Sequence, residues 1–248
     1  MNYKLLLDTA VTAGELMLEN GAETYRVEDT MHRILSLSSL QTAEVFVTMT
    51  GFVATLDDPS IHSMTVVRRI TSRGTNLDMI DRLNAVSRRL CTGELELEEA
   101  FSQVKSLKEH PWKPRAFLIS TPVATAAFAL TYGGSLSEAF APGLTGLIMA
   151  VCLYACRRLR MQSFFGTLLS AAAASMLASA LFHVFPGFGS LDSVVIASIM
   201  PLVPCVAITN AVFDTLHGDY LSGTARMLEA FVTAAAVAMG IGIGLGIG

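Results

Sequence analysis

The stretch SVVIASIMPLVPCVAITNAVFD, residues 193–214, decides the fold. Residues 193–213 carry no charged side chain, and a helix needs about 20 mostly apolar residues to cross a bilayer. Pro201 and Pro204 lie near the middle of this run. Each proline removes an amide donor and clashes with the carbonyl four residues earlier. The stretch therefore predicts a membrane-spanning helix that is broken or kinked at membrane depth.

Four other uncharged runs surround it, at residues 116–137, 139–156, 161–191 and 230–248. The run 161–191 is too long for one span, and Pro186, Gly187 and Gly189 supply a turn near its end. We therefore predict an α-helical membrane domain over residues 116–248 with five transmembrane helices. Their expected ranges are about 116–134, 138–156, 163–185, 192–213 and 228–248.

The N-terminal part has a different composition: residues 1–115 hold 13 of the 17 Lys and Arg and 16 of the 21 Asp and Glu. Helical periodicity ends at the helix-stopping pair Asn20-Gly21, and further helices are expected around 25–35, 77–90 and 97–107. Segments 43–50, 51–56 and 61–70 are rich in Val, Ile, Thr and Phe. We predict a small cytosolic α+β domain over residues 1–115, with about four helices and a three-stranded antiparallel sheet. Its last segment, residues 110–115, contains Trp112, which suits the membrane interface.

The basic residues of the membrane part predict its orientation. Arg157, Arg158 and Arg160 follow the second span, and Arg226 precedes the fifth. The positive-inside rule places all of them in the cytosol with the N-terminal domain, and the C-terminus outside. The net charge of −4 gives no basic surface for nucleic acid, so DNA and RNA are not expected as partners. The uncharged runs make the lipid bilayer the expected surroundings of residues 116–248.

The polar residues around the broken span predict a substrate site. Broken helices form such sites in many transporters, because their backbone lines a cavity. Thr209 and Asn210 follow the two prolines, Asp214 lies one turn after Asn210, and His217 lies three residues further on the same face. We expect Pro201, Pro204, Thr209 and Asn210 to bind substrate. A packing kink at the prolines, and a capping or interfacial role for Asp214, stay open.

A second set of residues is expected to couple or gate transport: Asp214, His217, Arg226 and His183. Asp214 can exchange a proton or contact Arg226, because a carboxylate at the membrane edge is costly unless paired or hydrated. His183 is the imidazole within a span and can exchange protons near neutral pH, with a packing role as the alternative. Gly240, Gly244 and Gly248 are spaced for a close helix or subunit contact.

The sequence gives little support to an enzyme. It has no phosphate-binding G-x-x-x-x-G-K-[ST] and no C-x-x-C pair, so no cofactor or metal is predicted. Catalysis in the N-terminal domain would have to use groups without a recognised nucleophile or metal spacing: Glu28, Asp29 and His32, or Asp57, Asp58 and His62. A non-transporting membrane scaffold or sensor is the other alternative.

Two stretches resemble the threonine/serine exporter family. The first is NGAETYRVEDTM, residues 20–31. The second runs from Pro201-Leu202-Val203-Pro204 through Thr209-Asn210-Ala211, Asp214, Gly218-Asp219 and Ser222-Gly223 to Arg226. The resemblance covers essentially the whole chain and adds Asp219 to the expected coupling or gating residues.

The resemblance also implies a function and a partner. Members of this family come as a fused ten-span form and as a split form, in which a YjjP-type subunit works with a small YjjB-type membrane subunit. This chain is similar to the YjjP-type half, so that subunit, a second copy of the chain, or both are expected partners. The implied function is secondary-active export of a small polar metabolite across the bacterial inner membrane: threonine or serine for the fused form, a succinate-like dicarboxylate for the split form.

Overall fold

The computed structural model describes residues 1–108, 114–184 and 190–247, and it divides the chain into two compact units. Unit 1 consists of Met1–Pro111 and Ala207–Met227, and unit 2 consists of Trp112–Val206 and Leu228–Gly248. Unit 1 therefore contains a segment that the sequence places in the membrane part. Trp112, the turn at residues 186–189 and Gly248, which all entered the predictions, lie outside the described residues.

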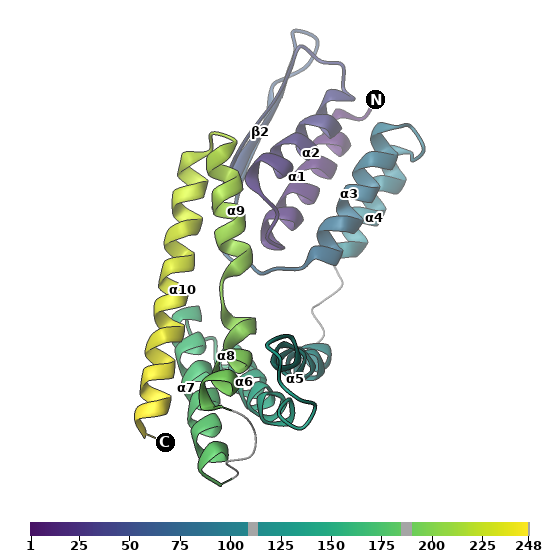
Figure 1. Ribbon diagram of the computed structural model, residues 1–248. Helices are drawn as coiled ribbons and strands as arrows, with labels where there is room; N and C mark the ends of the chain where they lie inside the picture. Colours follow the sequence, from purple (N-terminus) through teal and green to yellow (C-terminus); the bar gives the residue numbers. More distant parts are fainter. Residues whose placement is uncertain (109–113, 185–189, 248) are drawn as a thin grey trace. The chain divides into compact units, whose positions relative to one another are not determined.

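Unit 1 begins with two helices, α1 (Tyr3–Glu19) and α2 (Thr24–Ser36), and later adds α3 (Leu77–Cys91) and α4 (Leu97–Lys108) (Figure 1). Their apolar faces form one core, which includes Leu6, Met17 and Met31. The predicted end of the first helix is confirmed: α1 stops at Glu19, and Gly21 takes the left-handed conformation, with a φ of +87°.

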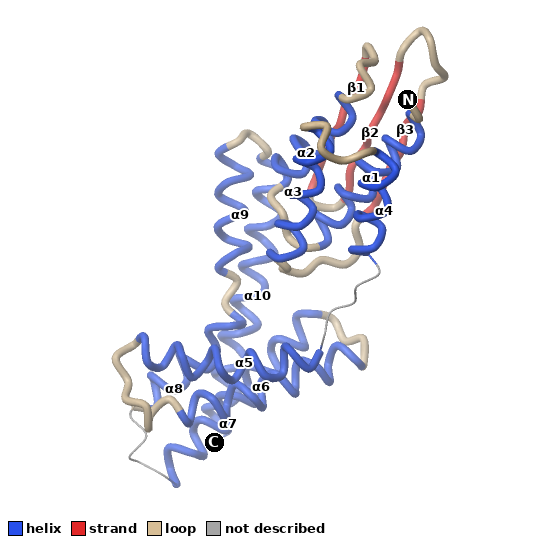
Figure 2. The backbone as a smooth tube through the Cα atoms, turned by 90° about the vertical axis from the view of Figure 1, so that its right-hand side faces the viewer, coloured by secondary structure: helices blue, strands red, loops and turns tan. Residues whose placement is uncertain are grey.

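The predicted three-stranded antiparallel sheet is confirmed, with strands β1 (Thr42–Thr48), β2 (Gly51–Asp57) and β3 (Met64–Arg69) in the order β1-β2-β3. Helices α1 and α2 cover one face of this sheet (Figure 2), where Val47, Phe52 and Leu56 are buried. The third strand starts later than predicted because Asp58 holds a turn: its side chain accepts hydrogen bonds from the Ser60 amide and hydroxyl.

The second segment of unit 1 comes from helices α9 (Cys205–Leu216) and α10 (Tyr220–Ile247). The two helices are joined at Gly218, which has a φ of +90°. They pack closely at Gly223, where an added Cβ would lie 3.0 Å from the Ala211 carbonyl oxygen and against the Thr215 hydroxyl. This close approach brings polar side chains of the two helices together.

Unit 2 contains α5 (Pro114–Thr131), α6 (Phe140–Arg158), α7 (Ser163–Val184), α8 (Leu191–Ile199), the 3₁₀ turn η1 (Met200–Leu202) and the remainder of α10. Among the described residues, α6, α7 and α10 are long and apolar enough to cross a membrane. A fourth candidate span is a bent pair of helices, in which α8 and η1 form the first part and α9 forms the second. The apolar part of α5, Ala116–Thr131, is shorter, so the count of five spans stays a prediction.

Small residues bring the helices of unit 2 together. A Cβ added at Gly244 would lie 2.5 Å from the Ala172 carbonyl oxygen, and one at Gly240 would lie 2.8 Å from the Ala171 Cβ. We call these two glycines and the α7 residues against them the small-residue contact. The expected close helix approach at Gly240 and Gly244 is therefore present, between α7 and α10.

Candidate functional site

The predicted break in residues 193–214 is present. Helix α8 ends at Ile199, η1 covers Met200–Leu202, and α9 begins at Cys205. Between them Val203 is extended, with φ −67° and ψ 129°, and its carbonyl accepts a 2.9 Å hydrogen bond from the Cys205 amide. Pro201 is exposed and Pro204 is half-buried. Since neither proline has an N–H, the regular helical bonding pattern cannot continue through this segment.

Beyond the break, α9 turns two polar side chains toward the loop between α1 and α2. Asn210 and Asp214 are buried, with Asp214 0% exposed. The Asn210 Nδ2 donates a 2.9 Å hydrogen bond to the Gly21 carbonyl oxygen. The Asp214 Oδ1 accepts bonds from the Thr24 amide at 3.1 Å and from the Thr24 hydroxyl at 2.8 Å. The two residues that were expected on one helix face are thus both engaged within unit 1.

Asp214 completes the start of α2. Thr24 is the first residue of this helix, and the N-cap residue, Glu23, makes no side-chain capping bond. The first turn of a helix has free amide donors and a partial positive charge, so a carboxylate is favoured there. Asp214 supplies that acceptor from a different helix. A capping bond of this kind stabilises by about 1 kcal/mol.

Arg226 closes the cluster from α10. Its Nε lies 2.8 Å from the Asp214 Oδ2, and its Nη2 donates a 2.6 Å hydrogen bond to the Ala22 carbonyl oxygen. The predicted contact between Asp214 and Arg226 is therefore present. The two side chains are 0% and 8% exposed. Within the described residues, Oδ2 and Nε make no directed hydrogen bond, so this contact is one between close buried charges.

The loop between α1 and α2 is held on its other side as well. The Gly74 amide donates a 2.8 Å bond to the Glu19 carbonyl oxygen, and the Asn76 amide a 3.0 Å bond to the Asn20 carbonyl oxygen. A Cβ at Gly21 would lie only 2.7 Å from the Gly74 carbonyl oxygen. The loop whose Gly21 and Ala22 carbonyls bind Asn210 and Arg226 is thus also held by backbone hydrogen bonds from the segment before α3.

Asp219, in the turn between α9 and α10, joins the same cluster. Its Oδ1 accepts a 3.0 Å hydrogen bond from the Ser222 amide in the first turn of α10. Its Oδ2 lies 2.9 Å from the Thr24 hydroxyl, which also contacts Asp214. We use the name polar junction for the set of residues in this cluster: Gly21, Ala22, Thr24, Asn210, Asp214, Asp219 and Arg226.

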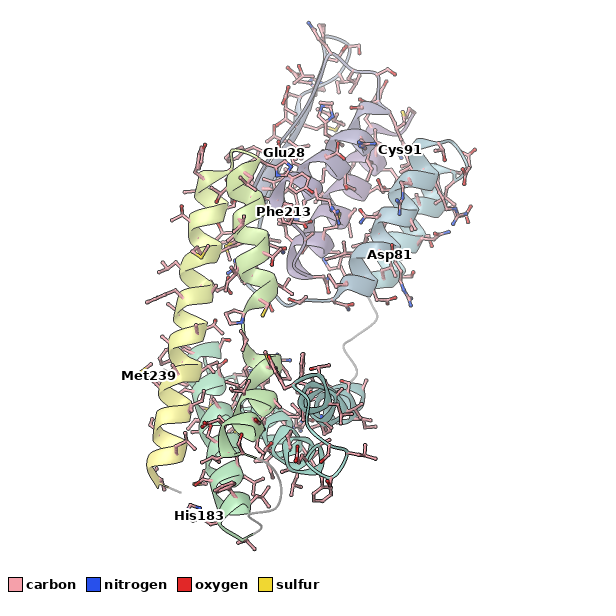
Figure 3. All side chains as sticks on the ribbon, viewed as in Figure 1. Glu28, Asp81, Cys91, His183, Phe213 and Met239 are labelled. Carbon is pink, nitrogen blue, oxygen red and sulfur yellow. The ribbon has the colours of Figure 1, made fainter. Side chains whose placement is uncertain are left out.

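The other predicted site residues lie outside the polar junction. His217 is exposed, and its ring stacks on Tyr25 with centroids 4.0 Å apart and planes 2° apart. Thr209 is exposed on α9, before Phe213, which Figure 3 labels on the same helix. His183, also labelled there, belongs to unit 2, where its Nδ1 lies 2.9 Å from the Ser179 carbonyl oxygen.

The residues considered for catalysis do not converge on one site. Glu28 (Figure 3) accepts a 3.3 Å bond from the Val47 amide, and Asp29 forms an exposed ion pair with Arg33 at 2.8 Å. Hydrogen bonds from Ser60 and Gln41 hold Asp58 in its turn, and the same bonds lower the pKa of the Asp58 carboxyl. Within the described ranges, no group of three or more His, Cys, Asp or Glu is placed to hold a metal ion.

The partners that the loop between α1 and α2 supplies to this cluster could not be predicted from the sequence. Thr24 donates to Asp214, whereas the Gly21 and Ala22 carbonyls accept from Asn210 and Arg226, and each pair lies far apart in the chain. One signal was available, because these residues and Asp214 fall in the two separate stretches that resemble the same family. In the structure the two stretches meet at the polar junction.

Comparisons with known proteins identify the family of the chain. The model of the ThrE family, described as "Putative threonine/serine exporter", matches residues 8–248. A relative from Mycobacterium tuberculosis (strain ATCC 25618 / H37Rv), named "Probable threonine/serine exporter", is 23% identical over 245 residues, which is 96% of this chain and 45% of the relative. This chain thus spans about half the length of that relative. No solved structure matches the chain. Since the family model covers nearly every residue, the chain belongs to the threonine/serine exporter family.

Proposed function

We propose that this chain is a subunit of a secondary-active exporter of small polar metabolites, threonine or serine or a dicarboxylate such as succinate, in the bacterial inner membrane. The broken helix at Met200–Leu202 carries the proposal, because two apolar helices meet there through extended backbone and two prolines. Such a break presents main-chain dipoles that can replace the hydration of a carboxylate and an amino group. The names of the family and of the relative supply the substrate class.

The residues divide between two roles in this proposal. Pro201, Pro204 and Thr209 form or flank the break and bind substrate, together with Asn210 when its amide is released from Gly21. The contact between Asp214 and Arg226 acts as the coupling or gating element, assisted by Asp219, with His217 and His183 as further candidates. The buried ion pair supports this role, because its making or breaking changes the free energy of unit 1 by several kcal/mol.

A partner subunit is part of this proposal. The relative is about twice as long as the matched region, and its name refers to the whole protein. The resemblance to the split form supports a small YjjB-type membrane subunit as the partner, with a second copy of this chain as the alternative. Positive-inside placement puts the N-terminal part in the cytosol and the C-terminus outside.

Flux measured in proteoliposomes tests the function. We expect efflux of labelled threonine or serine when the chain is reconstituted with its partner subunit, and lower efflux for Asn210→Ala and Asp214→Asn at equal protein levels. Asp192→Asn, in the first turn of α8, is the matched control and should leave flux unchanged. Efflux of succinate without threonine would reassign the substrate to dicarboxylates. Absence of flux with every substrate would leave the scaffold or sensor as the better reading.

Labelling of engineered cysteines tests the orientation. Thr75→Cys, between β3 and α3, should be protected from an impermeant reagent added outside intact cells. Gly189→Cys, outside the described residues, should be labelled by the same reagent. The opposite pattern would reverse the proposed topology.

A further inference from the structure

The turn between α6 and α7 contains a residue in an unusual backbone conformation. Arg160 has a φ of +55°, in the left-handed region that favours glycine. Its amide donates a 3.0 Å hydrogen bond to the Arg157 carbonyl oxygen, and the Met161 amide donates a 3.0 Å bond to the Cys156 carbonyl oxygen. This pair of bonds after the end of a helix is the Schellman motif, which usually has glycine at the left-handed position.

Four other helices of this chain end with the same motif but with glycine. The same pair of backbone bonds follows α1, α3, α5 and α9. Their left-handed residues are Gly21, Gly93, Gly133 and Gly218. In the described parts of the chain this motif therefore has glycine four times and arginine once. Because the Cβ of arginine makes this conformation costly, the presence of Arg160 points to a contribution from its side chain.

The side chains of this turn combine positive charge with apolar surface. Arg158 and Arg160 are both exposed, and among the described residues neither side chain has a hydrogen-bond or ion-pair partner. Leu159 lies between them in the chain and is 74% exposed. Met161 and Phe165, which follow, are also exposed. Two unpaired guanidiniums are thus combined with apolar side chains on one short segment.

The position of the turn in the fold gives it a membrane surface as its surroundings. Helix α6 ends at Arg158 and α7 begins at Ser163, and both helices are long and apolar enough to cross a membrane. A connection of four residues between two such helices lies at one face of the bilayer. The guanidinium of Arg157 is held over the Phe117 ring of α5, 5.5 Å from the ring centroid. The two unpaired arginines are therefore those at the level of the lipid headgroups.

We infer that the α6–α7 turn binds the headgroup of an anionic phospholipid. The guanidiniums of Arg158 and Arg160 bind the phosphate, because arginine donates two parallel N–H bonds to such an oxyanion. Leu159 and Phe165 contact the acyl chains where these meet the headgroups. Binding of the lipid offsets the backbone cost of the left-handed Arg160. In the proposed orientation the lipid belongs to the cytosolic leaflet.

A simpler role for these arginines is to complement the dipole of α6. Cationic side chains are favoured in the last turn of a helix, where Arg158 lies. Arg88 and Arg89 occupy the last turn of α3 in the same way, and there Gly93 takes the left-handed position. Complementing a helix dipole therefore does not require arginine at the left-handed position. Helix α3 also supplies a matched control, because Arg88 and Arg89 are exposed as well.

Thermal unfolding of the full chain in a neutral detergent tests the site. Added phosphatidylglycerol should raise the Tm of the parent more than added phosphatidylcholine does, because a ligand that binds the native state stabilises it. Arg158→Gln with Arg160→Gln should lose most of this difference, and Arg88→Gln with Arg89→Gln should keep it. Inorganic phosphate should give no comparable rise. An equal response of the two double variants, or an equal rise with inorganic phosphate, overturns the lipid site.

The variant Arg160→Gly tests the link between the backbone conformation and the lipid. In neutral detergent without phosphatidylglycerol its Tm should exceed that of the parent, because glycine adopts the left-handed conformation without a Cβ. Phosphatidylglycerol at saturation should shrink or reverse this advantage, because the variant lacks one of the two guanidiniums. A lower Tm of Arg160→Gly without the lipid, or an advantage that the lipid leaves unchanged, overturns the inference.

Titration with fluorescent phosphatidylglycerol measures the affinity directly. Removal of each arginine should weaken binding about fivefold at low salt, and the loss should be smaller at high salt. Unchanged affinity in Arg158→Gln with Arg160→Gln would overturn the site. None of these measurements depends on transport. Lipid binding by a chain that exports no substrate would leave the lipid site standing and the export proposal refuted.

Discussion

Helix α10 takes part in two contacts of opposite chemistry. In unit 1 its Arg226 enters the polar junction, where a buried ion pair and bonds to loop carbonyls hold the α1–α2 loop. In unit 2 its Gly240 and Gly244 form the small-residue contact with α7, which depends on the absence of side chains. The first contact is specified by charge and direction, the second by shape. The first should therefore respond to removal of a charge, and the second only to added volume.

The largest effect is expected from breaking the ion pair of the polar junction. Arg226→Ala leaves the Asp214 carboxylate buried without its counter-charge, which typically costs about 3–5 kcal/mol of stability. Thermal unfolding in detergent measures the loss. The double variant Asp214→Asn with Arg226→Gln should lose clearly less than the sum of the two single changes. Strict additivity would mean that the two side chains do not act as a pair.

Adding volume to the small-residue contact should have the next largest effect. Gly244→Leu forces a side chain against the Ala172 carbonyl oxygen, and overpacking of this kind costs about 1–3 kcal/mol. Gly246→Leu is the matched control, because a Cβ at Gly246 would have no neighbouring atom within 4 Å among the described residues. The difference in melting temperature between these variants should not change with pH. Equal melting temperatures would show that α7 and α10 do not approach closely at Gly244.

A smaller effect is expected at the loop that the polar junction holds. Gly21→Ala adds a Cβ to a residue that has a left-handed backbone conformation. The new Cβ would also lie 2.7 Å from the Gly74 carbonyl oxygen. Gly93→Ala has a similar φ, +77°, with nothing within 4 Å, so it reports the conformational strain alone, about 1–2 kcal/mol. Gly21→Ala should be the more destabilising of the two in a denaturation series. An equal loss of stability in Gly21→Ala and Gly93→Ala would contradict the close approach of Gly21 to the Gly74 carbonyl oxygen.

The smallest effect is a pH dependence at the turn between β2 and β3. Hydrogen bonds from the Ser60 hydroxyl, the Ser60 amide and the Gln41 amide lower the pKa of Asp58 below its ordinary value of 3.8. The ionised form therefore stabilises the fold above that value, and this contribution is lost as the pH falls through the lowered pKa. Asp58→Asn should flatten the acid side of the stability profile. The neighbouring Asp57→Asn serves as the control, and an equal change in both would contradict the assignment.

Local sequence signals were sufficient for the elements of unit 1 and for the broken helix. Asn20-Gly21 ends α1 because glycine adopts the left-handed conformation cheaply, and the Val-rich and Thr-rich segments form the three strands. Pro201 and Pro204 break the helix because they lack an amide hydrogen. Each of these features depends on residues close together in the chain, which is why periodicity and turn chemistry could predict them.

The polar junction could be predicted only in part. The loop carbonyls of Gly21 and Ala22 gave no signal, because every residue has a carbonyl and its direction is set by the fold. The packing of Ala207–Met227 with Met1–Pro111 was missed for a similar reason: apolar composition identifies a helix suited to a membrane but not the protein surface beside it.

The capping of α2 by Asp214 also has a consequence for the order of biosynthesis. Asp214 follows Thr24 by 190 residues. At about 5–20 residues per second, a ribosome needs roughly 10–40 s to make that length. During this time the N-terminal helices are outside the ribosome while the first turn of α2 lacks its acceptor. The nascent N-terminal part therefore lacks this capping acceptor until α9 has been made, and a truncated chain that stops before Asp214 would leave the first turn of α2 without it.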